Sequence, residues 1–193
     1  MPEPPSHLSG GVYPERAAEL RRMAEADQAM RRSGTVDSSA DREHARRLKE
    51  IIQAIGWPTT SKVGQEASHQ AWLLAQHADH DPAFQQECLR LMQEAPEGDV
   101  QQSDLAYLED RVRVNGGRLQ LYGTQFHVDE HGEYHPRPIE DPERLDERRR
   151  AAGLEPFAHY RATLIAFYQE LLQTWRQQPG PSGSEPPQSG PGS

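Results

Sequence analysis

Apolar residues recur with a helical period along most of the chain. Between 14 and 176 a spacing of about 3.6 residues is far more frequent than the alternation typical of strands. Pro14 stands where a first helical residue is expected, and Gly56 follows an apolar stripe directly, as helix-ending glycines do. The pattern predicts seven helices, at 14–32, 38–56, 63–78, 81–95, 103–117, 141–153 and 156–175.

Short polar residues mark several of the expected helix starts. Asp81 followed by Pro82 predicts an N-cap and a first helical residue, and Ser103 and Asp141 are expected to cap the helices that they precede. The pair Gly116–Gly117 is expected to end the fifth helix.

One stretch departs from the helical pattern. Residues 118–139, RLQLYGTQFHVDEHGEYHPRPI, alternate apolar and polar positions on either side of a DEHGE turn, which predicts a small hairpin or an extended excursion. The predicted fold class is therefore all-α (mainly α): an irregular bundle of about seven helices with one small β-hairpin excursion.

Composition separates a body from two tails. Residues 177–193, QQPGPSGSEPPQSGPGS, contain little that a folded core could bury, and residues 1–12 have a similar composition. We expect both tails to be disordered and residues 13–176 to form a single helical domain.

Charge and cysteine content exclude several classes of protein. The formal net charge is -9, from 21 Lys and Arg against 30 Asp and Glu, which opposes the phosphate neutralisation that nucleic-acid binding requires. The chain has one cysteine, no basic and apolar leader, and no apolar run of roughly 18 residues. We expect a cytoplasmic protein with no nucleic-acid or membrane partner; the oligomeric state is left open.

The predicted helix 63–78 is apolar on two faces. Small and aliphatic residues form one face, and the opposite face carries a histidine, a tryptophan, a leucine and an amide: His69, Trp72, Leu73 and Gln76. His77 lies between the two faces. A helix of this kind is expected to run through the middle of the bundle, where buried polar groups need hydrogen-bond partners.

His77 admits a structural and a functional interpretation. It is either a hydrogen-bonded core residue or, held by a carboxylate, a general base, because the ordinary pKa of histidine lies near neutrality. Asp79 is the nearest carboxylate in sequence, although on a continuing helix position i+2 points elsewhere. Asp27, Asp41 and Asp110 from other helices are alternative partners.

Histidine clusters raise the question of a metal. In HADHD, His77 and His80 are three residues apart across an expected helix end, and Asp81 is better used as a cap. The hairpin histidines 127, 131 and 135 are spaced by four around an exposed turn and are expected to be solvated. We therefore expect no metal and no cofactor.

The segment YGTQF, 122–126, is a second candidate site. Gly123 interrupts a strand-like run, which often marks a bulge or a close approach of backbone to a ligand. Hydroxyl and amide groups of Tyr122, Thr124 and Gln125, together with Gln120, suit a small polar ligand. The alternative is a hairpin fixed to the core by buried hydrogen bonds.

Six ordered blocks carry a resemblance that covers most of the chain from Leu20 to Tyr160. They are DQAMR at 27–31, GWP at 56–58, VGQEASHQAWLLAQHAD at 63–79, LAYLEDRV at 105–112, LYGTQF at 121–126 and PIEDPERLDERRRAAGLEP at 138–156. In this order they resemble a bacterial family known only as a domain of unknown function. The resemblance implies no reaction and assigns no catalytic residue.

Two functions remain. The favoured one is binding of a small polar molecule or peptide in a pocket between the helices 14–32 and 63–78 and the YGTQF segment. Its candidate ligand-binding residues are Asp27, Gln28, Arg31, His69, Trp72, Gln76, Asp110, Arg111, Gln120, Tyr122, Thr124 and Gln125. The alternative is a hydrolase-like enzyme in which His77 acts as general acid or base with a carboxylate such as Asp79.

Overall fold

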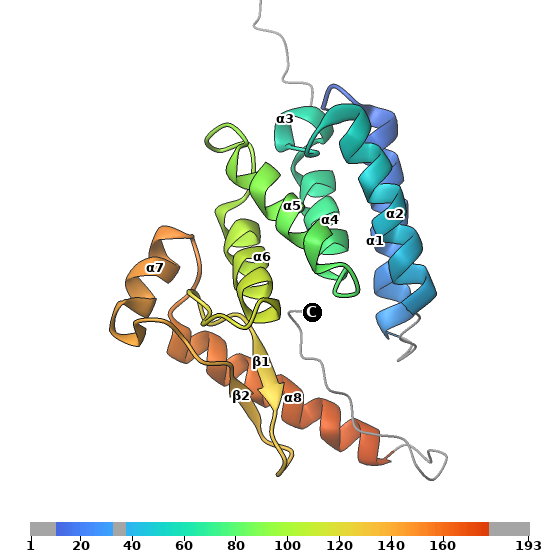
Figure 1. The fold of residues 1–193 in the computed structure, drawn as a ribbon. Coiled ribbons are helices and arrows are strands. Elements are labelled where there is room, and N and C mark those ends of the chain that lie inside the picture. The colour runs from blue at the N-terminus through green and yellow to red at the C-terminus, as the bar shows by residue number, and fades with distance from the viewer. Residues whose placement is uncertain (1–10, 33–37, 178–193) are drawn as a thin grey trace, which may run out of the picture. The chain divides into compact units, whose positions relative to one another are not determined.

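The computed structural model of the protein describes residues 11–32 and 38–177. These residues form eight α-helices, a short 3-10 helix and one two-stranded antiparallel hairpin (Figure 1), which confirms the predicted mainly-α class. Of the tails predicted to be disordered, 1–10 and 178–193 lie outside the described residues. No helix within the described ranges is long and apolar enough to cross a membrane.

The chain groups into two compact units, with the division after Leu108. The N-terminal unit contains five complete helices and the start of a sixth, which continues past the division: α1 Pro14–Arg32, α2 Ser38–Ile55, α3 Thr60–Val63, α4 Gln65–Gln76, α5 Pro82–Gln93 and α6 Gln102–Asn115. For five of these six helices, the first and last residues lie within two positions of those predicted from the sequence.

Helix α4 lies at the centre of the N-terminal unit, in contact with α1, α2, α3 and α5. Its alanines Ala67 and Ala71 are fully buried and permit close helix approach, while Trp72 and Gln76 are buried on the other side. The predicted burial of this helix on two faces is thereby confirmed, although His69 on the second face is exposed.

The short helix α3 was not predicted. Gly56 and Gly64 both have positive φ, of 69° and 85°; Gly56 directly follows the last residue of α2, and Gly64 is the C-cap of α3. The chain between them has room for a single turn, Thr60–Val63, and for the buried Trp57. The helix predicted from residue 63 therefore begins only at Gln65.

The C-terminal unit is built around the hairpin and the last helix. It contains β1 Phe126–Val128, β2 Tyr134–Pro136, the 3-10 helix η1 Pro142–Arg144, α7 Leu145–Ala151 and α8 Phe157–Gln177. The strands pair antiparallel with His127 opposite His135, and β2 contacts α8. The predicted hairpin is present, with strands shorter than the 118–139 alternation indicated.

Aromatic rings fill the interior of this unit. Tyr134 stacks on Tyr168 with ring centroids 4.7 Å apart and on Phe126 at 5.1 Å. Arg149 is 1% exposed and lies 4.6 Å from the ring centroid of Tyr160. A buried guanidinium of this kind also needs hydrogen-bond acceptors, and the backbone carbonyl groups of Tyr122 and Glu155 provide them.

Two predicted helix caps are wrong. α6 begins at Gln102, so Ser103 lies inside its first turn. Asp141 precedes η1 in a left-handed conformation, with φ of 44°, and its side chain makes no capping hydrogen bond. A cap requires extended backbone at the capping residue, and short polar side chains alone do not impose it.

The cap predicted at Asp81 is confirmed and is testable. Oδ1 of Asp81 accepts a hydrogen bond from the Phe84 N–H at 3.1 Å, and Lys49 Nζ lies 2.6 Å from Oδ2. Replacing Asp81 by Ala should lower the free energy of unfolding by about 1 kcal/mol at pH 7, measured by urea denaturation. Glu87→Gln, an exposed change on the same helix, should leave the unfolding free energy unchanged.

The effect of Asp81→Ala should depend on pH. Lys49 and the Phe84 N–H hold the pKa of Asp81 below its ordinary value of 3.8. The carboxylate therefore stabilises the fold fully above that ordinary value, and this contribution is lost as the pH falls through the lowered pKa. A difference between the two proteins that stays constant down to pH 2 would contradict the assignment.

Candidate functional site

A buried carboxylate on α1 meets a histidine at the end of α4. Asp27 is 0% exposed, and its Oδ2 lies 2.9 Å from Nδ1 of His77, whose side chain is 3% exposed. The helical period directs Asp27 inward from the last part of α1, and His77 is the C-cap residue of α4. The carboxylate beside His77 is thus Asp27, one of the alternatives named from the sequence, and not Asp79.

Arg31, one turn after Asp27 on α1, contacts the same carboxylate. Its Nε lies 3.3 Å from both carboxylate oxygens of Asp27, and its Nη2 lies 2.9 Å from Oδ1 of Asp41 on α2. Burial acts to raise the pKa of Asp27, but the hydrogen bond from His77 and the positive charge of Arg31 act against burial, and this pKa lies below its ordinary value. Asp27 is therefore an ionised carboxylate inside the helical bundle.

The proton positions on His77 follow from its neighbours. Nδ1 lies 2.9 Å from the Asp27 carboxylate and 3.0 Å from Arg31 Nε, and it cannot donate to the first and accept from the second at once. An unprotonated Nδ1 would face the carboxylate lone pairs, so Nδ1 carries the proton and Arg31 donates to Asp27. In the neutral ring Nε2 is then an acceptor, and it is buried with no hydrogen-bond partner among the described residues.

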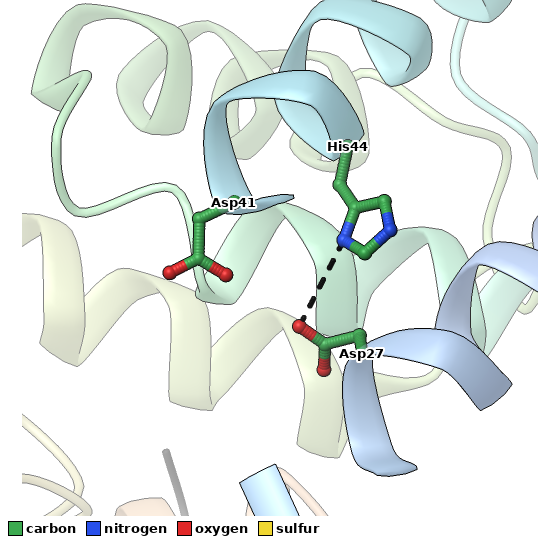
Figure 2. Close-up of side chains that lie close together, drawn as sticks. All are labelled: Asp27, Asp41 and His44. Carbon is green, nitrogen blue, oxygen red and sulfur yellow. Dashed lines mark ion pairs between the residues drawn. The ribbon is translucent and has the colours of Figure 1, made fainter. Parts of the chain in front are cut away.

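His44 on α2 faces the same carboxylate. Its Nδ1 lies 4.0 Å from Oδ1 of Asp27 (Figure 2), a separation too long for a hydrogen bond. Ligand atoms of Asp27, Asp41 and His44 all lie within 4.8 Å of one another. We refer to Asp27, Arg31, Asp41, His44 and His77 as the Asp27 cluster.

Three further predicted residues surround this cluster in sequence or space. Gln28 donates to Oδ2 of Asp27 at 3.2 Å. Gln76, next to His77, is 0% exposed, and neither polar atom of its side chain has a hydrogen-bond partner within the described part of the chain. The indole N–H of Trp72 is likewise buried without a partner there. Polar groups in this condition are unusual and call for an explanation.

Asp79, predicted as a catalytic partner, has a different place. Its Oδ1 accepts a hydrogen bond from Gln85 Nε2 at 3.1 Å, and Gln85 also donates to the carbonyl groups of Ala75 and Gln76. These contacts join the end of α4 to α5. The carboxylate thus takes part in the helix connection.

His69 forms a second histidine–carboxylate pair, with Asp104 on α6. Nδ1 lies 2.9 Å from Oδ2 of Asp104, and the ring stacks on Trp72 with centroids 4.8 Å apart. The hydrogen bond to Asp104 raises the pKa of His69, whereas burial raises the pKa of Asp104 despite its histidine partner. The two shifts are compatible, because the carboxylate is the more deeply buried member.

In the C-terminal unit, Asp110 holds the YGTQF segment. Its buried carboxylate accepts hydrogen bonds from the backbone N–H groups of Leu121 at 2.6 Å, Tyr122 at 3.0 Å and Thr124 at 3.0 Å, and from the Thr124 hydroxyl at 2.9 Å. Burial raises the pKa of Asp110, and these donors act against that shift. Three backbone donors on one carboxylate fix the path of the segment.

The amides of this segment are also engaged. Gln120 donates to the carbonyl groups of Gln125 at 3.0 Å and Arg137 at 2.7 Å, and its Oε1 accepts from the Gln125 N–H. Gln125 accepts from Arg111 Nη1 at 3.1 Å and donates to the Thr124 hydroxyl. These contacts support the structural alternative for the segment, a loop fixed by buried hydrogen bonds.

A glycine is required at position 123 by the backbone conformation and by a neighbouring aromatic ring. Its φ is 70°, and a Cβ at this position would lie 2.7 Å from Cε2 of Phe157. The adjacent carbonyl of Tyr122 accepts a hydrogen bond from Arg149 at 2.6 Å, and Glu155 provides a second carbonyl for the same guanidinium. The close approach predicted from the glycine is therefore to an aromatic ring.

The chain matches a family model over residues 14–171, described as Family of unknown function (DUF6624). The chain belongs to this family. No curated protein and no solved structure is detectably similar to it. Membership in a family of unknown function assigns no role to the Asp27 cluster, which must be interpreted from its own geometry.

Two residues of these sites escape notice in the sequence. Asp104 lies in the first turn of α6 and resembles an ordinary N-terminal acidic residue, and His44 lies in a charged stretch, SSADREHARR, that is typical of a solvated face. One signal was available for His44, because Asp41 and His44 are three residues apart and share a face of α2.

The role of Asp110 is testable by substitution. Asp110→Ala would leave the N–H groups of Leu121, Tyr122 and Thr124 without their acceptor, which should lower the free energy of unfolding by about 2–4 kcal/mol. Asp110→Asn keeps one acceptor oxygen and should cost less. Urea denaturation of both variants measures the difference, and an Asn variant at least as damaging as the Ala variant would contradict this account.

Proposed function

We propose that the protein binds a small polar molecule at the Asp27 cluster of its N-terminal unit. The observation that carries the proposal is the state of His77: Nδ1 is fixed on Asp27 while Nε2 is buried without a partner in the described chain. Leaving a buried polar atom unpaired costs roughly 1–3 kcal/mol. A ligand that hydrogen-bonds to this atom would recover that free energy.

The charges and exposure of the cluster fit such a ligand. Arg31, Asp41 and His44 have side chains 23%, 13% and 16% exposed, so they border the solvent above the fully buried Asp27. Both signs of charge are available within a few ångströms. This combination favours a ligand with its own donors and acceptors over an apolar one.

Composition supports the expected setting. The net charge of -9 disfavours nucleic acid as a partner, and a single cysteine fits the bacterial cytoplasm. The proposal therefore includes a cytoplasmic location for this small-molecule binding protein.

Ligand binding can be tested by thermal denaturation with a panel of amino acids, nucleosides, sugars and carboxylic acids. A compound at 100 times its Kd stabilises the fold by about 2.7 kcal/mol, which raises Tm by several degrees. The shift should disappear in Arg31→Gln and persist in Arg46→Gln, an exposed arginine of α2 that also pairs with carboxylates. Equal shifts in both variants would refute a site at the Asp27 cluster.

A second candidate function has one observation in its favour. The Asp27–His77 pair, 2.9 Å apart, has the arrangement in which a carboxylate orients a histidine and leaves Nε2 to move a proton. A hydrolase-like reaction on the bound polar molecule would use Nε2 as general acid or base.

This candidate is tested by screening the protein against ester, amide and phosphoester substrates. Any activity found should fall about 10²–10⁴-fold in His77→Gln and in Asp27→Asn. His69→Gln removes the other carboxylate-paired histidine and should leave the rate unchanged. Circular dichroism establishes that each variant is folded. Activity that survives in a folded His77→Gln protein would rule out this role.

A further inference from the structure

Two groups of three potential metal ligands occur among the described residues. One is Asp27, Asp41 and His44, and the other is Asp129, Glu133 and His135 on the hairpin. In the hairpin group His135 Nε2 already pairs with Asp129 at 3.0 Å and with Glu133 at 3.3 Å, and the group borders solvent. The first group differs in burial and in having a ring nitrogen, Nδ1 of His44, with no hydrogen-bond partner among the described residues.

Helix geometry brings the first group together. Asp41 and His44 are three residues apart on the first two turns of α2, so they project from one face. Asp27 faces them from α1 (Figure 2). A carboxylate and a histidine at i and i+3, completed by a carboxylate from a neighbouring helix, is a way in which helical bundles build metal sites in their interior.

The unpaired nitrogen supplies an independent argument. Nδ1 of His44 is buried, has no hydrogen-bond partner in the described structure, and points at Oδ1 of Asp27 from 4.0 Å. That distance is too long for a hydrogen bond, but it suits two ligands of one ion, since each metal–ligand bond measures about 2.0–2.2 Å. An ion between these atoms would give His44 Nδ1 a partner and would replace Arg31 at Oδ1 of Asp27.

Asp27 is also oriented as a metal ligand would be. His77 and Gln28 donate to its Oδ2, at 2.9 Å and 3.2 Å. Oδ1 is the oxygen that lies 4.0 Å from Nδ1 of His44. Hydrogen bonds to the far side of a ligating group fix its orientation and are a regular part of metal sites.

Arg31 is the competing cation. Its Nη2 lies 2.9 Å from Oδ1 of Asp41 and 3.3 Å from Oδ1 of Asp27, so it offers positive charge to the same two carboxylates. Its side chain is 23% exposed and can turn toward solvent. A divalent ion would balance the two negative charges without Arg31.

We propose that Asp27, Asp41 and His44 bind one divalent transition-metal ion, in competition with the guanidinium of Arg31. The mixture of carboxylate and imidazole ligands favours Mn²⁺, Fe²⁺ or Zn²⁺ over Ca²⁺ and Mg²⁺, which prefer oxygen ligands alone. The inference rests on the proposed function, because the ion would occupy the same cluster that is proposed to bind the polar ligand.

Calorimetric titration of the full, chelator-treated protein with MnCl₂, and separately with ZnCl₂, tests the site. We expect one ion per chain, with affinity at least about tenfold weaker in Asp41→Asn and in His44→Gln. Arg31→Gln should bind at least about fivefold more tightly, since the competing charge is removed. His135→Gln, in the hairpin group, is the matched control and should bind as the unaltered protein does.

Several results would overturn the proposal. They are no heat of binding at 100 µM protein, an affinity of the Asp41→Asn and His44→Gln variants equal to that of the unaltered protein, or loss of binding in His135→Gln. The sign of the Arg31→Gln effect separates this inference from the proposed function, because that variant should lose polar-ligand shifts but gain metal affinity. Arg31-dependent ligand shifts that persist in EDTA, without metal binding, would refute the metal site and retain the function.

Discussion

The buried carboxylate of Asp27 is the interaction on which the N-terminal unit depends. An ionised group with no exposure is stable only when its charge is paired and its oxygens accept hydrogen bonds. His77 from the end of α4 and Arg31 from α1 meet that need, and Arg31 continues to Asp41 on α2. One carboxylate therefore connects α1, α2 and α4, whose alanine-lined faces permit close packing but would not by themselves select a single alignment.

Two buried carboxylates in this chain show opposite arrangements. Asp110 accepts from three backbone N–H groups and a hydroxyl, all within one loop, and this set is typical of a structural residue that fixes a backbone path. Around Asp27 the donors are side chains, and two nearby ring nitrogens, His44 Nδ1 and His77 Nε2, are buried without a hydrogen-bond partner in the described structure. Unpaired polar atoms beside an organised charge are the reason to place function there.

Most of the secondary structure could be predicted because its causes are local. The start of α5 depends on Asp81 and Pro82, and the end of α2 depends on Gly56, whose φ of 69° few other residues adopt. Cap predictions were wrong at two positions where contacts elsewhere in the fold set the backbone conformation. Ser103 lies inside α6, and the side chain of Asp141 makes no capping hydrogen bond. The single turn of α3 was missed because two glycines leave too few residues for a periodic pattern.

The amino-acid sequence by itself determined the helical class and the two buried faces of α4, since hydrophobic period and helix-ending residues act over a few positions. Only the tertiary structure decided which carboxylate His77 meets. Asp79 is two residues away but is engaged with Gln85, whereas Asp27 is fifty residues away and in contact. Side-chain pairing across helices depends on their packing, which sequence separation does not encode, and this is why Asp41 and His44 could be grouped with Asp27 only when α1 and α2 were placed together.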